Sequence, residues 1–262
     1  VESERAEALL RELYRPLNLI ETPIVVTNLE SAELIKYAAN AFLATKITFI
    51  NQMANLAEAA GADIHEIARS MGMDGRISSK FLHPGPGYGG SCFPKDTRAI
   101  AATGDEYGVD MSLIKEVVRS NERQKEITAE KFIQLAGGVE GKTVAILGLA
   151  FKAETDDIRE SPAITIAQTL LDAGAKIQAH DPEAGENFKA RFQEKVSVHL
   201  DAFDALKGAD ALIILTEWNA YRNLDLSRAA AVMRGRVIMD ARNVLEPEMA
   251  REAGFEYKGV GR

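Results

Sequence analysis

The amino-acid sequence predicts an α/β protein made of two unlike parts: an all-helical domain built on one long helix, followed by a Rossmann-like domain with a parallel sheet. Residues 31–60 contain neither proline nor glycine, and their apolar side chains recur at spacings of three, four and seven, as in a helix. The composition changes at the pair Gly137-Gly138. Beyond this pair, short apolar runs alternate with helical patterns, which is typical of a parallel sheet covered on both faces.

These patterns divide the chain into three segments. Residues 1–26 resemble a helix and a connection, residues 27–136 form the helical domain, and residues 137–262 form the α/β domain. In the third segment the sequence predicts strands at 143–148, 176–181, 196–198, 211–216 and 236–241, with helices at 162–174, 184–193 and 225–233. Ligands of such sheets bind at the carboxyl ends of the strands.

The sequence predicts where the long helix of the second segment begins and which role it has. Thr27 and Glu30 have the spacing of a capping box, which marks a helix start. At 1.5 Å per residue, a helix over residues 31–60 would be about 45 Å long, which few single domains need. We therefore expect this helix to be shared between two subunits and to form a homodimer interface. Shorter helices are expected at 63–72, from Pro94 onward, and at 112–135.

The composition narrows the class of protein. A formal net charge of −8 and a pI near 5.2 argue against an extended nucleic-acid surface or an anionic membrane partner. A single cysteine permits no internal disulfide, and no apolar run approaches the roughly 18 residues of a membrane span. The four histidines have no ligand spacing, and one cysteine cannot build a zinc site. These observations predict a cytoplasmic protein without a bound metal.

The single cysteine, Cys92, lies in the stretch PGPGYGGSCFPKD, residues 84–96. Pro94 fits the first turn of a helix, so the thiol would precede the amino end of that helix, with Lys95 close in sequence. The helix dipole and the ammonium group both favour the thiolate, which is the reactive form. The glycines before the cysteine predict an open approach for a ligand. The alternative is a small buried thiol without a chemical role.

Other side chains could assist such a thiol. Lys36 and Asn40 are four residues apart and therefore lie on one face of the long helix. Together they could donate hydrogen bonds to an oxygen that becomes negative during a reaction, although a solvated helix face is the simpler alternative. Asp96 could complement the dipole of its own helix or act as a base towards water. A Cys–His pair with His83 is a further alternative that no spacing supports.

The α/β domain lacks the usual dinucleotide motif. Its first predicted strand ends in GLAFK, residues 148–152, which is not the G-x-G-x-x-G turn that binds a pyrophosphate. Lys152, Arg159 and Arg242 lie just beyond the first and last predicted strands, where their side chains could meet phosphates. The alternative is that these residues are exposed surface charges.

Three stretches together resemble one family. AELIKYAANAFLATK, FLHPGPGYGGSCFPKD and GLAFKAETDDIRESPA are similar to the helix, the catalytic loop and the nucleotide-domain signature of the nucleotide-sugar 6-dehydrogenases, with the UDP-glucose branch most similar. The resemblance covers essentially the whole chain. It implies an NAD-dependent oxidoreductase that converts UDP-glucose to UDP-glucuronate by two hydride transfers, and it implies that the α/β domain binds the UDP moiety.

The same resemblance implies roles for the candidate residues. Cys92 matches the family nucleophile, which would capture the intermediate aldehyde as a thiohemiacetal and then carry a thioester. Lys36 and Asn40 would stabilise oxygen charge at C6, and Asp96 would assist the water or hold Cys92. The implied substrate-binding residues are Lys36, Asn40, Arg76, Phe81, Leu82, His83, Pro84, Gly85, Tyr88, Gly89, Phe151, Lys152 and Arg242. The implied NAD-binding residues are Cys92, Lys95 and Arg159.

One departure from the family affects the expected activity. The family begins with a Rossmann domain that carries the glycine fingerprint, and no such motif occurs in this sequence. We therefore expect residues 1–26 to be the trailing element of that domain. We also expect the chain alone to bind a uridine nucleotide without reducing NAD+. In a dimer, Arg76 would reach the substrate of the neighbouring subunit.

Other interpretations remain open. The substrate could be GDP-mannose or UDP-N-acetylmannosamine, which other branches of the family oxidise. The chain could instead be a non-catalytic nucleotide-sugar binding module, in which Cys92 has no role. A relative of the β-hydroxyacid dehydrogenases would explain Lys36 and Asn40 but neither the thiol loop nor the α/β domain.

Overall fold

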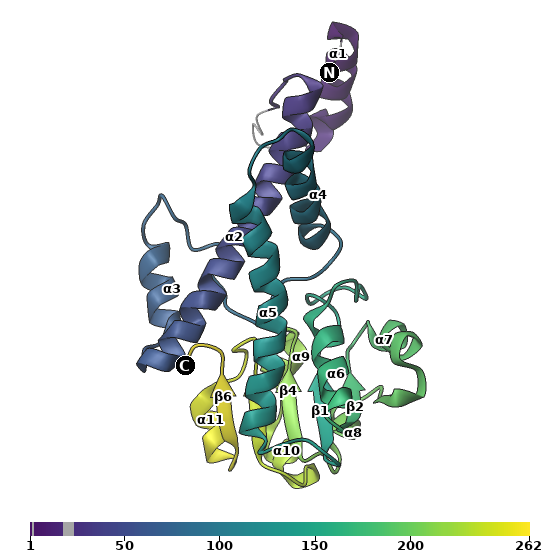
Figure 1. Ribbon diagram of the computed structural model, residues 1–262. Coiled ribbons are helices and arrows are strands. Elements are labelled where there is room, and N and C mark those ends of the chain that lie inside the picture. Colours follow the sequence, from purple (N-terminus) through teal and green to yellow (C-terminus); the bar gives the residue numbers. More distant parts are fainter. Residues whose placement is uncertain (2, 18–23) are drawn as a thin grey trace.

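A single long helix, α2 (Leu29–Ala60), runs through the helical part of the molecule (Figure 1). The computed structural model describes residues 1, 3–17 and 24–262, so part of the predicted segment 1–26 lies outside the described residues. The other elements of this part are α1 (Glu4–Tyr14), the 3-10 turn η1 (Arg15–Leu17), α3 (Ile64–Gly72), α4 (Phe93–Glu106) and α5 (Ser112–Leu135). No helix in the described ranges is long and apolar enough to cross a membrane.

The ends of α2 are set by two residues. The side chain of Asn28 accepts a hydrogen bond from the backbone N–H of Ser31, and Gly61 ends the helix in the left-handed conformation, with φ 71°. The capping box predicted at Thr27 is therefore wrong by one position. The physical reason is that asparagine caps a helix at least as well as threonine, so both residues carried the same signal.

Within residues 24–262, six parallel strands form one sheet in the order β3-β2-β1-β4-β5-β6. The strands are β1 (Thr143–Leu147), β2 (Lys176–His180), β3 (Val196–Val198), β4 (Ala211–Ile214), β5 (Val237–Asp240) and β6 (Glu256–Gly259). The predicted parallel sheet is confirmed. The strand order reverses between β1 and β4, and open α/β sheets bind ligands at the carboxyl ends of the strands at such a point.

Helices cover both faces of this sheet, as the apolar strands predicted. They are α6 (Pro162–Asp172), α7 (Gly185–Phe192), α8 (Ala202–Leu206), α9 (Asn219–Arg222), α10 (Leu226–Val232) and α11 (Pro247–Glu252), with a 3-10 turn, η2 (Gln193–Lys195), after α7. Along β1, Val144 and Ile146 face one apolar cluster, while Ala145 and Leu147 face the other. This alternation follows from the two-residue period of a strand.

The sequence did not predict β6 or the short helices α8, α9 and α11. β6 contains only four residues, EYKG, with charged side chains at two of them, so it has no apolar run. The three helices have four to six residues, which is too short for a helical period to be visible.

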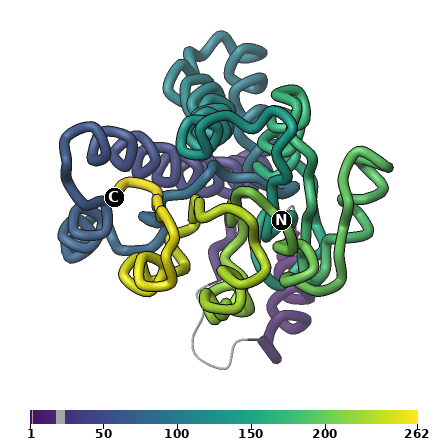
Figure 2. The backbone as a smooth tube through the Cα atoms, turned by 90° about the horizontal axis from the view of Figure 1, so that it is seen from below, coloured from purple at the N-terminus to yellow at the C-terminus, as the bar shows by residue number. Residues whose placement is uncertain are grey.

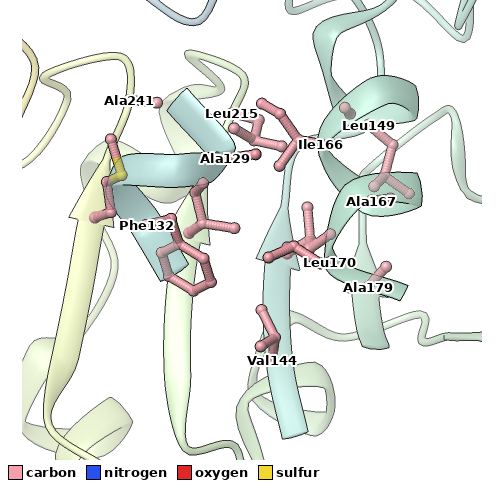
Figure 3. Close-up of a cluster of buried hydrophobic side chains, with 14 of the residues drawn as sticks. Ala129, Phe132, Val144, Leu149, Ile166, Ala167, Leu170, Ala179, Leu215 and Ala241 are labelled. Atoms are coloured by element: carbon pink, nitrogen blue, oxygen red, sulfur yellow. The ribbon is translucent and has the colours of Figure 1, made fainter. Parts of the chain in front are cut away.

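The two parts of the chain share one hydrophobic core. Phe132 of α5 packs with Leu170 of α6 and with strand residues such as Val144 (Figure 3). At the far end of the chain, the carbonyl of Gly261 accepts from the N–H of Ile64 (2.9 Å), which places the C-terminus beside α3 (Figure 2). The helical part and the sheet are therefore held together at two separate places.

Candidate active site

The segment of residues 81–92, called the glycine loop below, lies between the helical part and the carboxyl ends of the strands. It is bound to the α/β part by the N–H of Gly90, which donates to the carbonyl of Arg159 (2.8 Å). Gly85 lies against Arg242, which follows β5. The loop therefore meets the edge of the sheet at which parallel α/β folds bind ligands.

Buried amide side chains fix the backbone of the glycine loop. Asn51 of α2 accepts from the N–H of Gly85 (2.8 Å), and Gln124 of α5 donates to the Gly85 carbonyl (3.0 Å). Asn121 accepts from the N–H of Tyr88 (2.8 Å) and donates to its carbonyl (3.1 Å). All three amides are buried, so they satisfy loop groups that water does not reach. Sequence reasoning missed them because they are far from the loop along the chain.

The glycines of this loop are packed more closely than the expected open approach implies, although Gly87 and Gly89 also line a cavity described below. Gly85, Gly89 and Gly90 are all buried. A Cβ atom at Gly89 would lie 2.5 Å from the carbonyl oxygen of Glu160, and one at Gly90 would lie 2.7 Å from the ring of Phe151. The physical reason for glycine is therefore close packing against the α/β part, and at Gly90 also a left-handed φ of 84°.

Cys92 is exposed, which excludes the alternative of a buried packing thiol. It occupies the N-cap position of α4, and Pro94 lies in the first turn, as predicted. Its two sequence neighbours line different cavities: Phe93 lines one of about 440 Å³, and Ser91 lines one of about 680 Å³. The thiol therefore lies at the positive end of a helix, between two residues that line different cavities.

Asp96 is hydrogen-bonded to two other predicted catalytic residues, Lys36 and Asn40. Its carboxylate is fully buried and accepts hydrogen bonds from Lys36 (2.8 Å), Asn40 (2.6 Å) and Lys95. Burial alone would raise the pKa of Asp96, but the hydrogen bonds from Lys36, Lys95 and Asn40 outweigh it and lower the pKa to about 2. The side chains of Lys36 and Lys95 are 57% and 60% exposed, so both ammonium groups remain accessible to a ligand. The ring of Tyr37 lies near both, 5.3 and 5.8 Å from the two nitrogens.

The 440 Å³ cavity joins the glycine loop to the strand ends. Its lining residues are Ile47, Lys80, Phe81, His83, Gly87, Tyr88, Gly89, Phe93, Phe151, Lys152, Glu217 and Arg242. Arg242 is fixed there by the carbonyls of Leu215 (3.0 Å) and Phe151 (3.4 Å) and by an ion pair with Glu217 (3.2 Å). The ammonium group of Lys152 lies 5.4 Å from the centre of the Phe151 ring. Aromatic side chains and three cationic side chains thus line one cavity.

The remaining predicted substrate residues lie elsewhere. Leu82 is buried in the core, and Pro84 lines a neighbouring cavity of about 510 Å³. The N–H and the carbonyl of Gly85 are already bound by the buried amides. The guanidinium of Arg76 is 91% exposed and pairs with Asp74 (2.6 Å).

Sequence reasoning also missed Glu217, Ile47 and Lys80, which line the 440 Å³ cavity. Glu217 follows the carboxyl end of β4 by three residues, so the strand-end rule used for Lys152 could have found it. Ile47 and Lys80 carry no such signal, because neither follows a strand.

The 680 Å³ cavity on the other side of Cys92 contains the predicted cofactor residues. It brings Lys95 and Arg159 together with three further cations. Its lining residues are Gly90, Ser91, Lys95, Arg98, Glu122, Lys125, Ile158, Arg159, Glu160, Ser161, Ile164, Thr165 and Arg191. Cations outnumber carboxylates in this lining, which suits an anionic ligand.

The turn after β1 is not available to a phosphate. The carboxylate of Asp181 accepts from the N–H groups of Leu149 (2.7 Å) and Ala150 (3.0 Å) and from the indole N–H of Trp218 (3.2 Å). In a glycine-fingerprint fold these backbone groups would face a pyrophosphate. Here a buried side chain of the protein occupies them. Across residues 1, 3–17 and 24–262, no three His, Cys, Asp or Glu side chains are grouped as metal ligands.

Comparison with protein families identifies both parts of the chain. Residues 30–123 match the central domain of the UDP-glucose/GDP-mannose dehydrogenase family, and residues 145–247 match the UDP binding domain of the same family. The chain belongs to this family. The resemblance expected from the three sequence stretches is thereby confirmed.

Individual relatives agree with this assignment. The chain is 46% identical over 259 residues to the UDP-glucose 6-dehydrogenase of Rhizobium meliloti, covering 98% of this chain and 59% of that protein. It is 42% identical over 260 residues to a UDP-glucose 6-dehydrogenase of Bacillus subtilis, covering 99% of this chain and 56% of that protein. The chain thus spans less than two thirds of the length of the relatives it matches.

Solved structures show the same fold. A UDP-glucose dehydrogenase from the archaeon Pyrobaculum islandicum superposes with a TM-score of 0.88 at 38% identity, covering 99% of this chain and 57% of that one. A UDP-D-ManNAc dehydrogenase from Pyrococcus horikoshii gives a TM-score of 0.81 at 28% identity, covering 99% of this chain and 58% of that one. The helical part followed by a parallel α/β domain is therefore the family architecture.

Proposed function

We propose that these residues form the nucleophile-bearing and substrate-binding parts of an NAD-dependent UDP-glucose 6-dehydrogenase, which oxidises UDP-glucose to UDP-glucuronate in two steps. The observation that carries this proposal is the placement of Cys92: the only thiol of the chain is exposed, lies at a helix N-terminus and stands between two residues that line different cavities. One cavity would hold the nucleotide sugar and the other the cofactor.

Cys92 would act after the first oxidation. Its thiolate sulfur would form a bond to C6 of the aldehyde, and the carbonyl oxygen would take up a proton to give a thiohemiacetal. Loss of the C6 hydride and of the hydroxyl proton would then give a thioester, which water would hydrolyse to the carboxylate and the free thiol. Covalent capture would keep the reactive aldehyde bound between the two oxidations.

Lys36 and Asn40 would stabilise the oxygen at C6 as it becomes negative. Their joint attachment to Asp96 would preset their positions before the substrate arrives, which is the arrangement that makes such donors effective. A pKa of about 2 makes Asp96 a weak base near neutral pH. We therefore assign Asp96 the role of holding the two donors rather than activating water.

The UDP moiety would lie in the 440 Å³ cavity. Lys152 and Arg242 would bind the diphosphate, and Phe81, Tyr88 and Phe151 would supply apolar walls. Of the other predicted contacts, His83 and Gly89 line this cavity and would also meet the UDP moiety. Pro84 lines the neighbouring cavity, and the backbone groups of Gly85 are already hydrogen-bonded. Leu82 would act through packing, because its side chain is buried.

Part of the NAD molecule would lie in the 680 Å³ cavity, since its cationic lining suits a diphosphate, and most of the cofactor's binding would come from outside these residues. Lys95 and Arg159 would hold it, beside Cys92. When bound, NAD+ supplies the acceptor for each hydride. The buried Asp181 that binds the turn after β1 supports a cofactor position outside the usual glycine turn.

A second copy of the chain would cover α2. Ile35, Phe42, Phe49 and Leu56 recur every seven residues along this helix, and each is 43–65% exposed. A stripe of this spacing is typical of a helix that packs on another helix. In such a homodimer the exposed Arg76 would reach the partner's substrate. We also propose that the protein works in the cytoplasm.

Absorbance assays of NADH formation by the full-length protein test this function. We expect turnover with UDP-glucose to exceed that with GDP-mannose and with UDP-N-acetylmannosamine. The second candidate is UDP-N-acetylmannosamine, because the Pyrococcus horikoshii structure of the same fold is named for this sugar, and faster turnover of it would replace the first assignment. UDP binding without turnover of any sugar would instead indicate a binding module.

A further inference from the structure

One loop of the substrate cavity has a strained backbone. The segment 73–80 connects α3 to the glycine loop. Ser78 within it and Phe81 directly after it adopt left-handed φ values of 66° and 64°. Such values are uncommon for residues other than glycine and need support from the surroundings. Asp74 supplies part of it: its carbonyl accepts from the N–H groups of Ile77 (2.9 Å) and Ser78 (3.0 Å).

The rest of the support comes from one ammonium group. Lys46, on α2, donates hydrogen bonds to the carbonyls of Ile77 (2.9 Å), Ser78 (3.3 Å) and Lys80. An ammonium group has three donors, so all of them are used on this loop. Three carbonyl oxygens that converge on one point repel one another unless a cation lies between them. The loop conformation therefore depends on the charge of Lys46 as well as on its hydrogen bonds.

This loop forms a wall of the proposed UDP cavity. Lys80 and Phe81 line the cavity, and so does Ile47, the residue next to Lys46. We propose that Lys46 is a positioning residue that holds this wall in its ligand-binding conformation. The proposal rests on the proposed function for the identity of the ligand, but the ordering of the loop by Lys46 does not. Lys46 itself does not line the cavity.

The variant Lys46→Met tests the proposal, because it keeps the apolar stem and removes the ammonium group. Lys131→Met is the matched control: the Lys131 ammonium also joins two helices, through Glu58 (2.8 Å) and Asn55 (2.8 Å), but touches no part of the loop. Both variants would be made in the full-length protein. Amide hydrogen exchange at residues 77–80 measures loop order without any ligand, and calorimetry with UDP measures binding.

We expect Lys46→Met to accelerate exchange at residues 77–80 and to raise the UDP dissociation constant by about tenfold, which corresponds to ~1.4 kcal/mol. Lys131→Met should lower the melting temperature while leaving both quantities unchanged. Lys46→Arg, which keeps the charge, should recover most of the UDP affinity.

Two results would overturn the proposal. One is an exchange rate at residues 77–80 of Lys46→Met that equals the wild-type rate. The other is an exchange rate raised by the same factor at all residues of the variant, which would indicate general destabilisation. Unchanged UDP affinity despite a loosened loop would remove the link to the cavity. Failure of the wild-type protein to bind UDP would overturn the proposed ligand alone, since the exchange measurement would still decide whether Lys46 orders the loop.

Discussion

Two buried aspartates in different regions of the molecule differ in the charge of their partners. Asp96, in the candidate active site, accepts from two ammonium groups and one amide. Asp240, at the carboxyl end of β5, accepts only from neutral donors, namely the N–H groups of Arg242 (3.1 Å) and Leu245 (2.7 Å) and the hydroxyl of Tyr257 (3.2 Å). Both carboxylates are fully buried.

The pKa values of the two groups shift in opposite directions. Burial raises the pKa of Asp240, and the neutral donors offset only part of this effect. At Asp96 burial also acts to raise the pKa, but the cationic partners lower it to about 2. The difference indicates two purposes: Asp240 fixes the backbone at a strand end, whereas Asp96 holds two exposed lysine side chains at the site where chemistry is proposed.

Replacing the two aspartates should separate these purposes. We expect Asp96→Asn to lower kcat by roughly 10²-fold, the usual loss when a preorganised donor is misplaced, with little change in UDP affinity. We expect Asp240→Asn to lower the free energy of unfolding by about 1–3 kcal/mol, because its amide group would face backbone donors, without a comparable loss of kcat. Steady-state kinetics and urea unfolding of both variants measure this. Equal losses of kcat in both would contradict the distinction.

Binding of the nucleotide should depend on the strand-end region. Lys152→Ala and Arg242→Ala should each weaken UDP binding by about 1–3 kcal/mol, the scale of hydrogen bonds to charged groups. Calorimetry with UDP and with NAD+ is the measurement, and NAD+ binding should change little. Equal loss of both ligands would indicate a folding defect, and unchanged UDP affinity would remove these residues from the site.

Features encoded locally were predictable from the sequence. Pro94 marks a helix start, and this sufficed to place Cys92 at its amino end. The absence of proline and glycine from residues 31–60 predicted α2. In contrast, Asp96 lies 60 residues from Lys36 along the chain, so their contact depends on how α4 packs on α2. A helical period says which face a residue occupies but not what that face meets.

The same limit explains why the close packing of the glycines was not predicted. Sequence shows that a side chain is absent at Gly89, but not whether a ligand or the chain itself fills the space. The structure shows the chain itself, through the carbonyl of Glu160. Lys46 was missed for a related reason: its three acceptors are backbone carbonyls, which every residue has.

The smallest expected effect is on the pH dependence of stability. The pKa of Asp96 is about 2 in the fold, against about 4 when unfolded, so its ionised form stabilises the fold above about pH 4 and this contribution is lost as the pH falls towards 2. The raised pKa of Asp240 acts in the opposite sense: its contribution is present at acid pH and is lost as the pH rises through the raised value.

Urea unfolding of the wild type and both variants as a function of pH measures this difference. As the pH falls towards about 2, the difference in free energy of unfolding between wild type and Asp96→Asn should become smaller. Over the same fall in pH, the difference between wild type and Asp240→Asn should become larger, with the wild type more stable. If the two differences in free energy of unfolding changed with pH in the same direction, the opposite pKa shifts of Asp96 and Asp240 would be contradicted.

Covalent catalysis by Cys92 is tested most directly by the product that Cys92→Ser forms from UDP-glucose and NAD+ in the full-length protein. A serine hydroxyl is a much weaker nucleophile than a thiolate but changes the shape of the site very little. We expect loss of UDP-glucuronate formation, measured by chromatography of the products, with UDP-glucose affinity retained within a few fold. UDP-glucuronate formation at the wild-type rate would contradict covalent catalysis by Cys92.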